Sequence, residues 1–289
     1  MKERIQKVLA NAGVASRRNV EEMVLQGRVA VNGKVVRELP VLIDAEEDEV
    51  TVDDERVRLG PAKGKGKGGP GTAGQRLYLL MNKPKGVYST NVAQGEQVRA
   101  IDLLPHDLPG RVYPVGRLDA ESRGLLLLTN DGELTNQLTH PRYGVAKTYR
   151  AVVDGFVGPE MVRELSQGIW LADKGKGTGA KTGRSHIKVI RKGRDRSVLE
   201  ITIREGRNRQ VRRMLARIGH KVRDLMRVKM GPLTLHGLGP GQFRPLTPRE
   251  VRELRRLPQR THAATGEDAG DPEAATADPA YPASGRGPA

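Results

Sequence analysis

The chain has 289 residues with 50 lysines and arginines against 34 acidic residues, and its formal net charge of +16 indicates a polyanionic partner. It contains no cysteine, which excludes thiolate catalysis, disulfides and cysteine-ligated metals. The six histidines form no closely spaced pair, so we expect no metal site. No apolar run reaches membrane-spanning length and the first residues lack a signal-peptide core, so we expect no membrane contact and a cytoplasmic location.

Two segments of biased composition divide the chain. Residues 60–74 are rich in glycine and lysine, which is typical of a flexible linker. From residue 258 onward the chain is rich in alanine, glycine, proline and threonine with little apolar periodicity, which is typical of a disordered tail. We therefore predict a small module at 1–59, a linker at 60–75, a larger domain at 76–257 and a tail at 258–289.

The first module has the pattern of two helices followed by a small sheet. Apolar residues recur at helical spacing over residues 5–12, and Gly13 is placed to end this helix. Ser16 can cap a second helix. The pair Asn32-Gly33 favours a two-residue hairpin, because both positions accept a positive φ. The pattern predicts a compact αβ unit.

This module resembles the S4-type RNA-binding domain, on residues 6–18 and 27–34. The resemblance implies that its polar face binds RNA phosphates. The alternative is a helical pair with ordinary solvated charges. The basic residues expected to contact RNA are Arg17, Arg18, Arg28 and Lys34.

The second domain mixes strand and helix patterns without a regular alternation of strand and helix. Residues 125–129 predict a buried strand ended by a turn at 130–132, and Thr247 begins a helix with Glu250 three residues on. The other predicted strands are 77–81, 147–153, 185–191 and 197–203, and the other predicted helices are 159–167 and 209–218. We therefore predict an α+β chain, in which the small module precedes a mixed, mainly antiparallel sheet with flanking helices.

Residues 115–132 combine charged residues and glycines with a strongly apolar strand. Asp119 lies between Arg117 and Arg123, and these guanidinium groups would favour an ionised carboxylate. A rigidly held anion of this kind can act as a nucleophile or a base without a cofactor. The alternative is a structural aspartate that caps a turn or pairs with an arginine.

The same segment resembles the active-site motif of the pseudouridine synthases. The resemblance is carried by GRLD at 116–119 and SRGLL at 122–126, and its continuation is similar to the branch that contains the bacterial enzymes RsuA and RluB. Three further motifs of the family occur in the expected order, at 82–86, 147–149 and 205–214. The resemblance covers residues 1–257, and it implies a catalytic domain that isomerises uridine in RNA with no metal and no cofactor.

The resemblance implies roles for four residues. Asp119 would be the essential residue, either as a nucleophile or as a base that takes a ribose proton. Arg117 would enter the RNA helix where the target base leaves it. Tyr149 would stack on the flipped uracil, and its alternative is a core tyrosine on a strand. Arg207 would pair with Asp119 and keep it ionised, and its alternative is a phosphate contact.

The other basic residues of these motifs are expected to contact RNA phosphates. They are Lys83, Arg209, Arg212 and Arg213. Lys83 and the nearby Lys85 are equally compatible with solvated side chains. Trp170 is expected in the hydrophobic core.

The motif at 207–213 is more similar to the large-subunit branch of the family than to the small-subunit branch. The expected partner is therefore large-subunit ribosomal RNA or a pre-ribosomal particle, bound by a monomer. A non-catalytic ribosome assembly factor is the alternative, because the charge and the first module fit both; Asp119, Tyr149 and Arg207 together favour the enzyme. A metal-dependent nuclease would need a carboxylate cluster, and only Glu121 lies beside Asp119.

Overall fold

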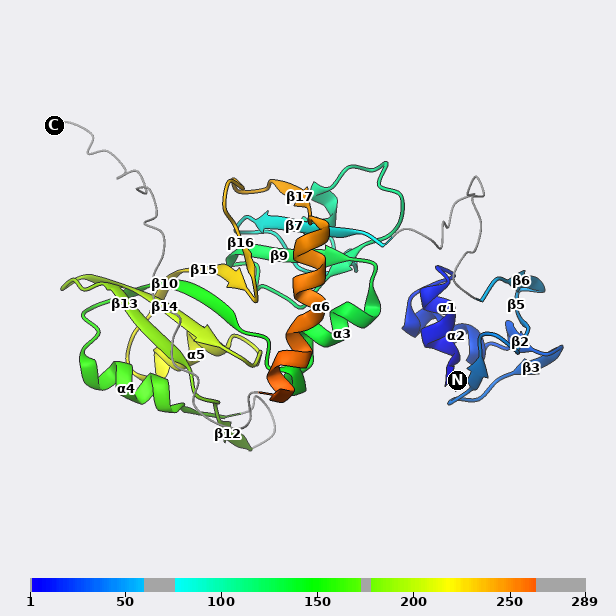
Figure 1. The fold of residues 1–289 in the computed structure, drawn as a ribbon, viewed down its shortest axis with the longest axis horizontal. Helices are drawn as coiled ribbons and strands as arrows, with labels where there is room; N and C mark the ends of the chain where they lie inside the picture. Colours follow the sequence, from blue (N-terminus) through cyan, green and yellow to red (C-terminus); the bar gives the residue numbers. More distant parts are fainter. Residues whose placement is uncertain (1, 60–75, 173–177, 264–289) are drawn as a thin grey trace.

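A computed structural model describes residues 2–59, 76–172 and 178–263, with the backbone alone over 258–263 (Figure 1). The N-terminal module has its own hydrophobic core, which includes Ile5, Leu9 and Val20. Its helices are α1 (Ile5–Asn11) and α2 (Arg17–Leu25). One antiparallel sheet has the order β3 (Lys34–Val36), β2 (Val29–Val31), β5 (Val50–Val52) and β6 (Glu55–Val57), and a second pairs β1 (Lys2–Arg4) with β4 (Leu42–Asp44).

The local signals of this module are confirmed. The Ser16 hydroxyl accepts a hydrogen bond from the backbone N–H of Asn19 at 3.2 Å, as a helix cap should. Asn32 and Gly33 have φ angles of 51° and 77° and join β2 to β3 in a two-residue turn.

The larger domain is built on one mixed sheet of nine strands. Its main path runs β13-β14-β10-β15-β9-β7-β17, with β16 beside β15 and β8 beside β9. The strands are β7 (Tyr78–Lys83), β8 (Tyr113–Pro114), β9 (Arg123–Thr129), β10 (Lys147–Asp154), β13 (His186–Arg191), β14 (Arg196–Ile203), β15 (Val222–Met230), β16 (Leu233–Thr234) and β17 (Phe243–Pro245). The β9–β15 pair is parallel and the other pairs of this sheet are antiparallel, so the predicted α+β class with a mainly antiparallel sheet is confirmed.

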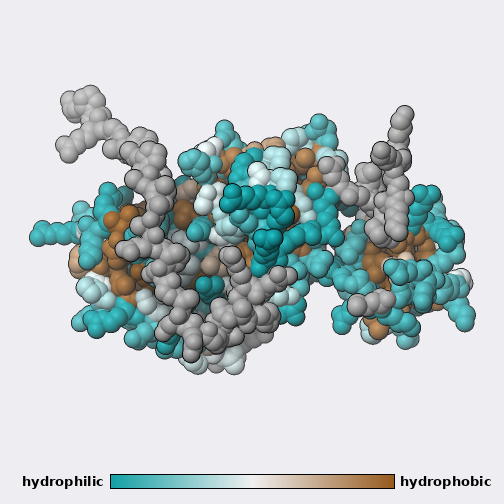
Figure 2. Space-filling model, in the orientation of Figure 1, coloured by the Kyte–Doolittle hydropathy of each residue, from teal (hydrophilic) through white to brown (hydrophobic). Residues whose placement is uncertain are grey.

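Helices cover the two halves of this sheet separately (Figure 1). The helices α4 (Pro159–Gln167) and α5 (Gln210–Arg217) pack with β10 and β14. The helices α3 (Gly132–Thr139) and α6 (Pro248–Ala263) pack with β7 and β9. The other face of β7 and β9 is buried against residues that include Val87 and Leu118. Burial on both faces explains the unbroken apolar run at 125–128. Hydrophilic residues cover the exposed side of α6 near the centre of the view in Figure 2.

The structure corrects several predictions made from local pattern. The strand ends at Thr129 as predicted, but residues 130–132 lead directly into α3, which Asp131 caps by accepting the backbone N–H of Leu134 at 3.1 Å. Helix α6 continues to Ala263, six residues past the predicted boundary at 257, although Pro258 follows Leu257 and proline disfavours a helix interior. No strand was predicted between residues 168 and 184, but the structure has β11 (Trp170–Ala172) there, paired with β12 (Gly179–Lys181). The predicted linker and most of the predicted tail lie outside the described residues.

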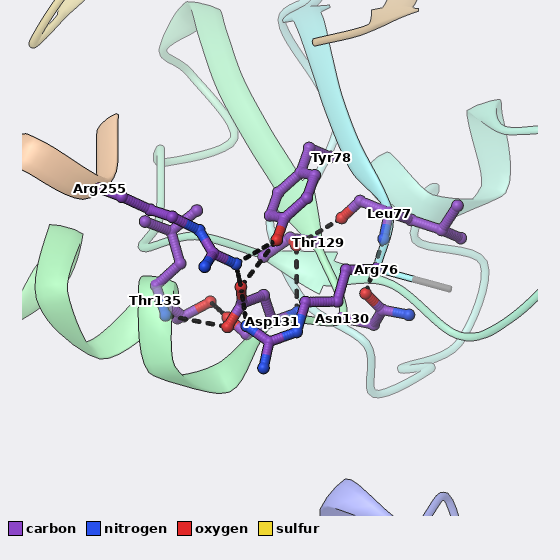
Figure 3. A network of polar contacts seen from close by, with 9 residues as sticks. Arg76, Leu77, Tyr78, Thr129, Asn130, Asp131, Thr135 and Arg255 are labelled. Atoms are coloured by element: carbon purple, nitrogen blue, oxygen red, sulfur yellow. Dashed lines mark hydrogen bonds and ion pairs between the residues drawn. The ribbon is translucent and has the colours of Figure 1, made fainter. Parts of the chain in front are cut away.

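A buried carboxylate ties together the first strand and the last helix of this domain (Figure 3). The side chain of Asp131 is 2% exposed and pairs with Arg76 at 2.6 Å and Arg255 at 2.9 Å. It also accepts the hydroxyl of Tyr78 at 2.8 Å. Burial alone would raise the pKa of Asp131, but its hydrogen bonds to Leu134, Tyr78 and Arg76 outweigh burial and lower it.

Within the described ranges no helix combines the length and apolar character that a membrane crossing requires.

Candidate active site

Asp119 lies in a tight turn immediately before β9. The backbone N–H of Ser122 donates to the carbonyl of Asp119 at 2.9 Å, and that of Gly86 donates to Ala120 at 2.8 Å. The preceding residue, Leu118, is buried and its N–H donates to the Ser89 hydroxyl at 3.2 Å. The Asp119 side chain is still 31% exposed. The turn therefore holds the carboxylate rigidly and presents it to solvent.

Gly124 allows the parallel strands β9 and β15 to approach closely beside this turn. Its φ is +106°, and a Cβ at this position would lie 2.3 Å from the backbone oxygen of Arg227. No other residue can occupy this space without moving β15. The close approach of β15 therefore explains why the SRGLL motif has a glycine at this position.

The arginine that pairs with Asp119 is Arg209, not the predicted Arg207. Nη1 of Arg209 lies 3.6 Å from Oδ2 of Asp119, and its Nη2 donates to Glu121 at 2.9 Å. Arg207 instead donates to the backbone oxygens of Ala180 and Lys181, each at 2.8 Å. The two arginines diverge because α5 begins directly after Arg209.

The predicted flanking arginines do not hold the Asp119 carboxylate either. Arg123 pairs with Asp224 at 2.8 Å. Arg117 is exposed and forms no ion pair within the described part of the chain. An exposed, uncommitted guanidinium is compatible with the predicted contact to RNA.

Arg212 is largely buried and hydrogen-bonds to the turn that carries Asp119. It is therefore poorly placed for the predicted contact with an RNA phosphate. Its side chain is 12% exposed. It donates to the backbone oxygen of Glu121 at 3.2 Å and to the Ser122 hydroxyl at 3.4 Å. Burial lowers the pKa of Arg212, and the charge of Glu121 opposes that effect. Arg213 is half-buried and donates to the backbone oxygen of Ala172.

Lys83 is fully buried, so the prediction that it contacts RNA phosphates is wrong. Its ammonium donates to the backbone oxygens of Pro84 at 2.9 Å and Val87 at 2.7 Å. Burial lowers the pKa of Lys83 to about 8, although the nearby Asp119 charge raises it. Lys85 is half-exposed and pairs with Asp224 at 2.8 Å. Two lysines of one motif thus have different surroundings, which spacing in the sequence does not indicate.

The buried lysine gives a testable pH dependence. With a folded-state pKa of about 8 against 10.5 for the free side chain, the unfolded chain binds more protons between these values. The stability of the wild type should therefore rise with pH across this window, relative to Lys83→Met, by up to about 3 kcal/mol. Urea denaturation of both proteins at pH 7, 8, 9 and 10 measures the difference, and parallel pH curves would contradict the assignment.

Tyr149 lies on β10, beside Ile201 of β14 and Arg227 of β15. The residue is half-buried and packs against two core clusters, one of which contains Leu118. Its position is therefore at the junction of the two halves of the sheet, near the turn that carries Asp119. The packing agrees with a core role, and the remaining exposure leaves a stacking role possible.

Substitutions of Tyr149 separate stacking from packing. Tyr149→Phe keeps an aromatic face and the packing volume, so RNA affinity should stay within about 3-fold of wild type. Tyr149→Leu keeps apolar volume without a π face and should weaken capture of the flipped base roughly 10-fold. Single-turnover kinetics over a range of enzyme concentrations measures both effects. Equal behaviour of the two variants would refute the stacking role.

The basic residues predicted in the first module lie on its surface. Arg17, Arg18 and Lys34 are exposed. Arg28 is exposed but already paired with Asp53 through a hydrogen bond of 2.7 Å. Over residues 2–59, 76–172 and 178–263, no group of three or more histidines, cysteines and carboxylates has a metal-binding arrangement.

The fold and the site together define an RNA-modifying enzyme. Residues 77–217 match the RNA pseudouridylate synthase family, and residues 3–50 match the S4 domain. The chain belongs to the RNA pseudouridine synthases, which are isomerases, and the resemblance seen in its motifs is confirmed. Its substrate is RNA, and the alternative of a non-catalytic binding factor is set aside.

Individual relatives are similar to this chain over most of its length. The chain is 44% identical over 257 residues to ribosomal large subunit pseudouridine synthase B of Bacillus subtilis (strain 168), covering 88% of this chain and 96% of that protein. It is 41% identical to an uncharacterized RNA pseudouridine synthase of Aquifex aeolicus (strain VF5), covering 88% and 94%. A crystal structure of a pseudouridylate synthase aligns with a TM-score of 0.59 at 28% identity, covering 87% of this chain and 99% of that one.

Proposed function

We propose that this enzyme converts a uridine of large-subunit ribosomal RNA to pseudouridine, with Asp119 as the catalytic residue. The observation that carries the proposal is the Asp119 carboxylate, which a rigid turn presents to solvent opposite Arg209. The choice of RNA follows the large-subunit relative named above, which is similar along nearly its full length.

The reaction needs only groups that the chain supplies. The bond between N1 of uracil and C1′ of ribose breaks, the base turns, and C5 bonds to C1′. The C5 proton is then lost and N1 gains one, so atoms and charge balance without an oxidant, reductant or metal. Asp119 acts either as a nucleophile or as the base that takes a ribose proton, and the position of its carboxylate is compatible with both.

The backbone at Arg209 supports a functional role for its side chain. Arg209 has a φ of 49° and a ψ of 33°, a left-handed conformation that is uncommon for residues other than glycine. Strained residues of this kind cluster at active sites, where the surrounding structure holds them. Here the conformation lets α5 begin while the guanidinium faces Asp119 and Glu121.

The remaining predicted residues take RNA-binding roles in this proposal. Arg117 occupies the space that the flipped uridine leaves, and Tyr149 stacks on the uracil. The N-terminal module adds phosphate contacts through Arg17, Arg18 and Lys34, with Arg28 as a weaker contributor because it is paired with Asp53. In this proposal the enzyme acts as a monomer in the cytoplasm, where ribosomal RNA is available.

Mapping pseudouridine in ribosomal RNA from cells with and without this protein tests the proposal. We expect one position, or one small group, in large-subunit RNA to lose its modification when the protein is absent. Wild-type protein should restore it. A loss confined to small-subunit RNA or transfer RNA would refute the substrate assignment.

A further inference from the structure

Trp170 is the sole tryptophan of the chain and is 61% exposed, contrary to the predicted core position. Its neighbours Ile169 and Leu171 are 4% and 5% exposed and pack in the core with α4 and α5. Side chains of a strand alternate between faces, so burial of these neighbours turns the indole outward. An indole held outward on a paired strand presents an aromatic face that can stack on a ligand.

The indole lies across the hairpin of β11 and β12. Trp170 is the cross-strand partner of Lys181. A Cβ built on Gly179 would lie 2.8 Å from Nε1 of the indole, so the ring extends over the place where this glycine has no side chain. The ring is thus supported on one side by β12, and its high exposure leaves the other side accessible.

The motif at 205–214 holds this hairpin in place. Arg207 donates to the backbone oxygens of Ala180 and Lys181, and Arg213 donates to that of Ala172. Arg209, which lies between these two arginines in the sequence, pairs with Asp119. The exposed tryptophan is therefore fixed relative to the catalytic carboxylate through one short segment of chain, rather than carried on an independent loop.

The charge around the ring selects the kind of ligand. Lys181 is exposed beside the indole, whereas Arg207, 28% exposed, already pairs with Glu205 at 3.3 Å. An aromatic face next to the exposed ammonium of Lys181 fits a nucleotide, because the base stacks on the ring and the phosphate contacts the positive charge. A protein partner would favour a contiguous apolar patch, whereas the outward neighbours of Trp170 on these strands are small or charged.

We propose that Trp170 and Lys181 form a second RNA contact, separate from the turn that carries Asp119. The indole stacks on an unpaired base that flanks the target uridine, and the ammonium of Lys181 contacts the adjacent phosphate. This proposal requires an RNA substrate, and it stands apart from the identity of the modified uridine and from the role of Asp119.

The intrinsic fluorescence of full-length wild-type protein tests the contact directly, because Trp170 is the single indole. Titration with a short single-stranded oligouridylate should quench the emission in a saturable way, and added salt should weaken the binding. A duplex RNA of equal length should quench less, because its bases are already stacked. Unchanged emission while anisotropy of labelled oligouridylate shows saturation would overturn the proposal.

Variants separate stacking from a structural effect, with affinity measured by the anisotropy of labelled oligouridylate. Trp170→Ala should weaken binding roughly 10-fold, whereas Trp170→Phe should stay within about 3-fold of wild type. Lys181→Gln should make the slope of log affinity against log salt concentration shallower, by the amount expected for the loss of about one phosphate contact. Phe156→Ala removes another exposed aromatic residue, 52% exposed before α4, and should bind as wild type does.

The outcomes also distinguish this contact from the proposed function. The Asp119→Asn protein should show the same quenching as wild type, because Asp119 does not touch the hairpin. Quenching with no pseudouridine change in ribosomal RNA would support the Trp170 contact and refute the substrate assignment. Equal affinities of Trp170→Ala, Trp170→Phe and wild type would refute the contact and leave the catalytic proposal intact.

Discussion

Replacement of Asp119 by asparagine should lower the rate of pseudouridine formation by at least about 10⁴-fold. The amide keeps the shape of the side chain but has neither the charge nor the basicity that the reaction needs. Folding should be nearly unaffected, because the side chain is 31% exposed and its ion pair with Arg209 is long, at 3.6 Å. Release of a tritium label from C5 of uridine under single-turnover conditions measures the rate.

Glu121 provides a matched control on the same turn. Its carboxylate is 62% exposed and also pairs with Arg209, at 2.9 Å. Like Asp119→Asn, Glu121→Gln removes one carboxylate charge that pairs with Arg209. We nevertheless expect its activity to stay within about 10-fold of wild type, since exposed ion pairs contribute little. Should Glu121→Gln be inactive and Asp119→Asn active, the assignment of the catalytic carboxylate is wrong.

Replacement of Asp131 by alanine should lower the free energy of unfolding by about 3 kcal/mol, the largest stability effect we expect. The substitution removes the cap of α3 and leaves Arg76, Arg255 and the Tyr78 hydroxyl without their shared acceptor. Arg76 and Arg255 are half-exposed, so water can solvate them in the variant. The loss of unfolding free energy should therefore be at the lower end of the range for breaking a buried ion pair. Urea denaturation should show a lower midpoint with an unchanged slope.

Two further variants sharpen this test. Asp131→Asn should fall between wild type and alanine, because an amide oxygen can still accept the Leu134 N–H. Glu253→Ala breaks the exposed pair with Arg249 on α6 and should cost less than about 0.5 kcal/mol. Equal losses in Asp131→Ala and Glu253→Ala would mean that the carboxylate does not join β7, α3 and α6.

The pH dependence of the Asp131 pairs has a defined sign. The folded-state pKa of Asp131 is lowered, so the unfolded chain takes up the proton first as pH falls. The stability advantage of wild type over Asp131→Asn is therefore complete above the ordinary aspartate pKa of about 4. It should shrink as pH falls below that value, and an advantage that grows in acid would contradict the assignment.

The sequence by itself determined the class of protein and the elements with local causes. The Ser16 cap and the Asn32-Gly33 turn depend on residues at most three positions apart, so their patterns predict the observed geometry. The predicted helix start at Thr247 has the same origin, since Thr247 and Glu250 form reciprocal hydrogen bonds. The sequence also placed Asp119 correctly just before β9, because the motif and the apolar strand are adjacent in the chain.

Tertiary structure alone decided which charged groups meet. Arg207 and Arg209 are two residues apart in one motif, and the left-handed backbone at Arg209 determines which of them faces Asp119. Asp131 lies in a sequence typical of a turn, but its two arginine partners come from the segment just before β7 and from α6.

Burial of polar and aromatic side chains was also set by distant chain segments. The β15 strand was not predicted because its pattern is charged, and it is central because β9 and β10 pair with it on both sides. Lys83 is buried and Trp170 is exposed, the reverse of what their residue types favour. Burial depends on which segments fold over a residue, and contacts between residues remote in sequence have no local periodicity to reveal them.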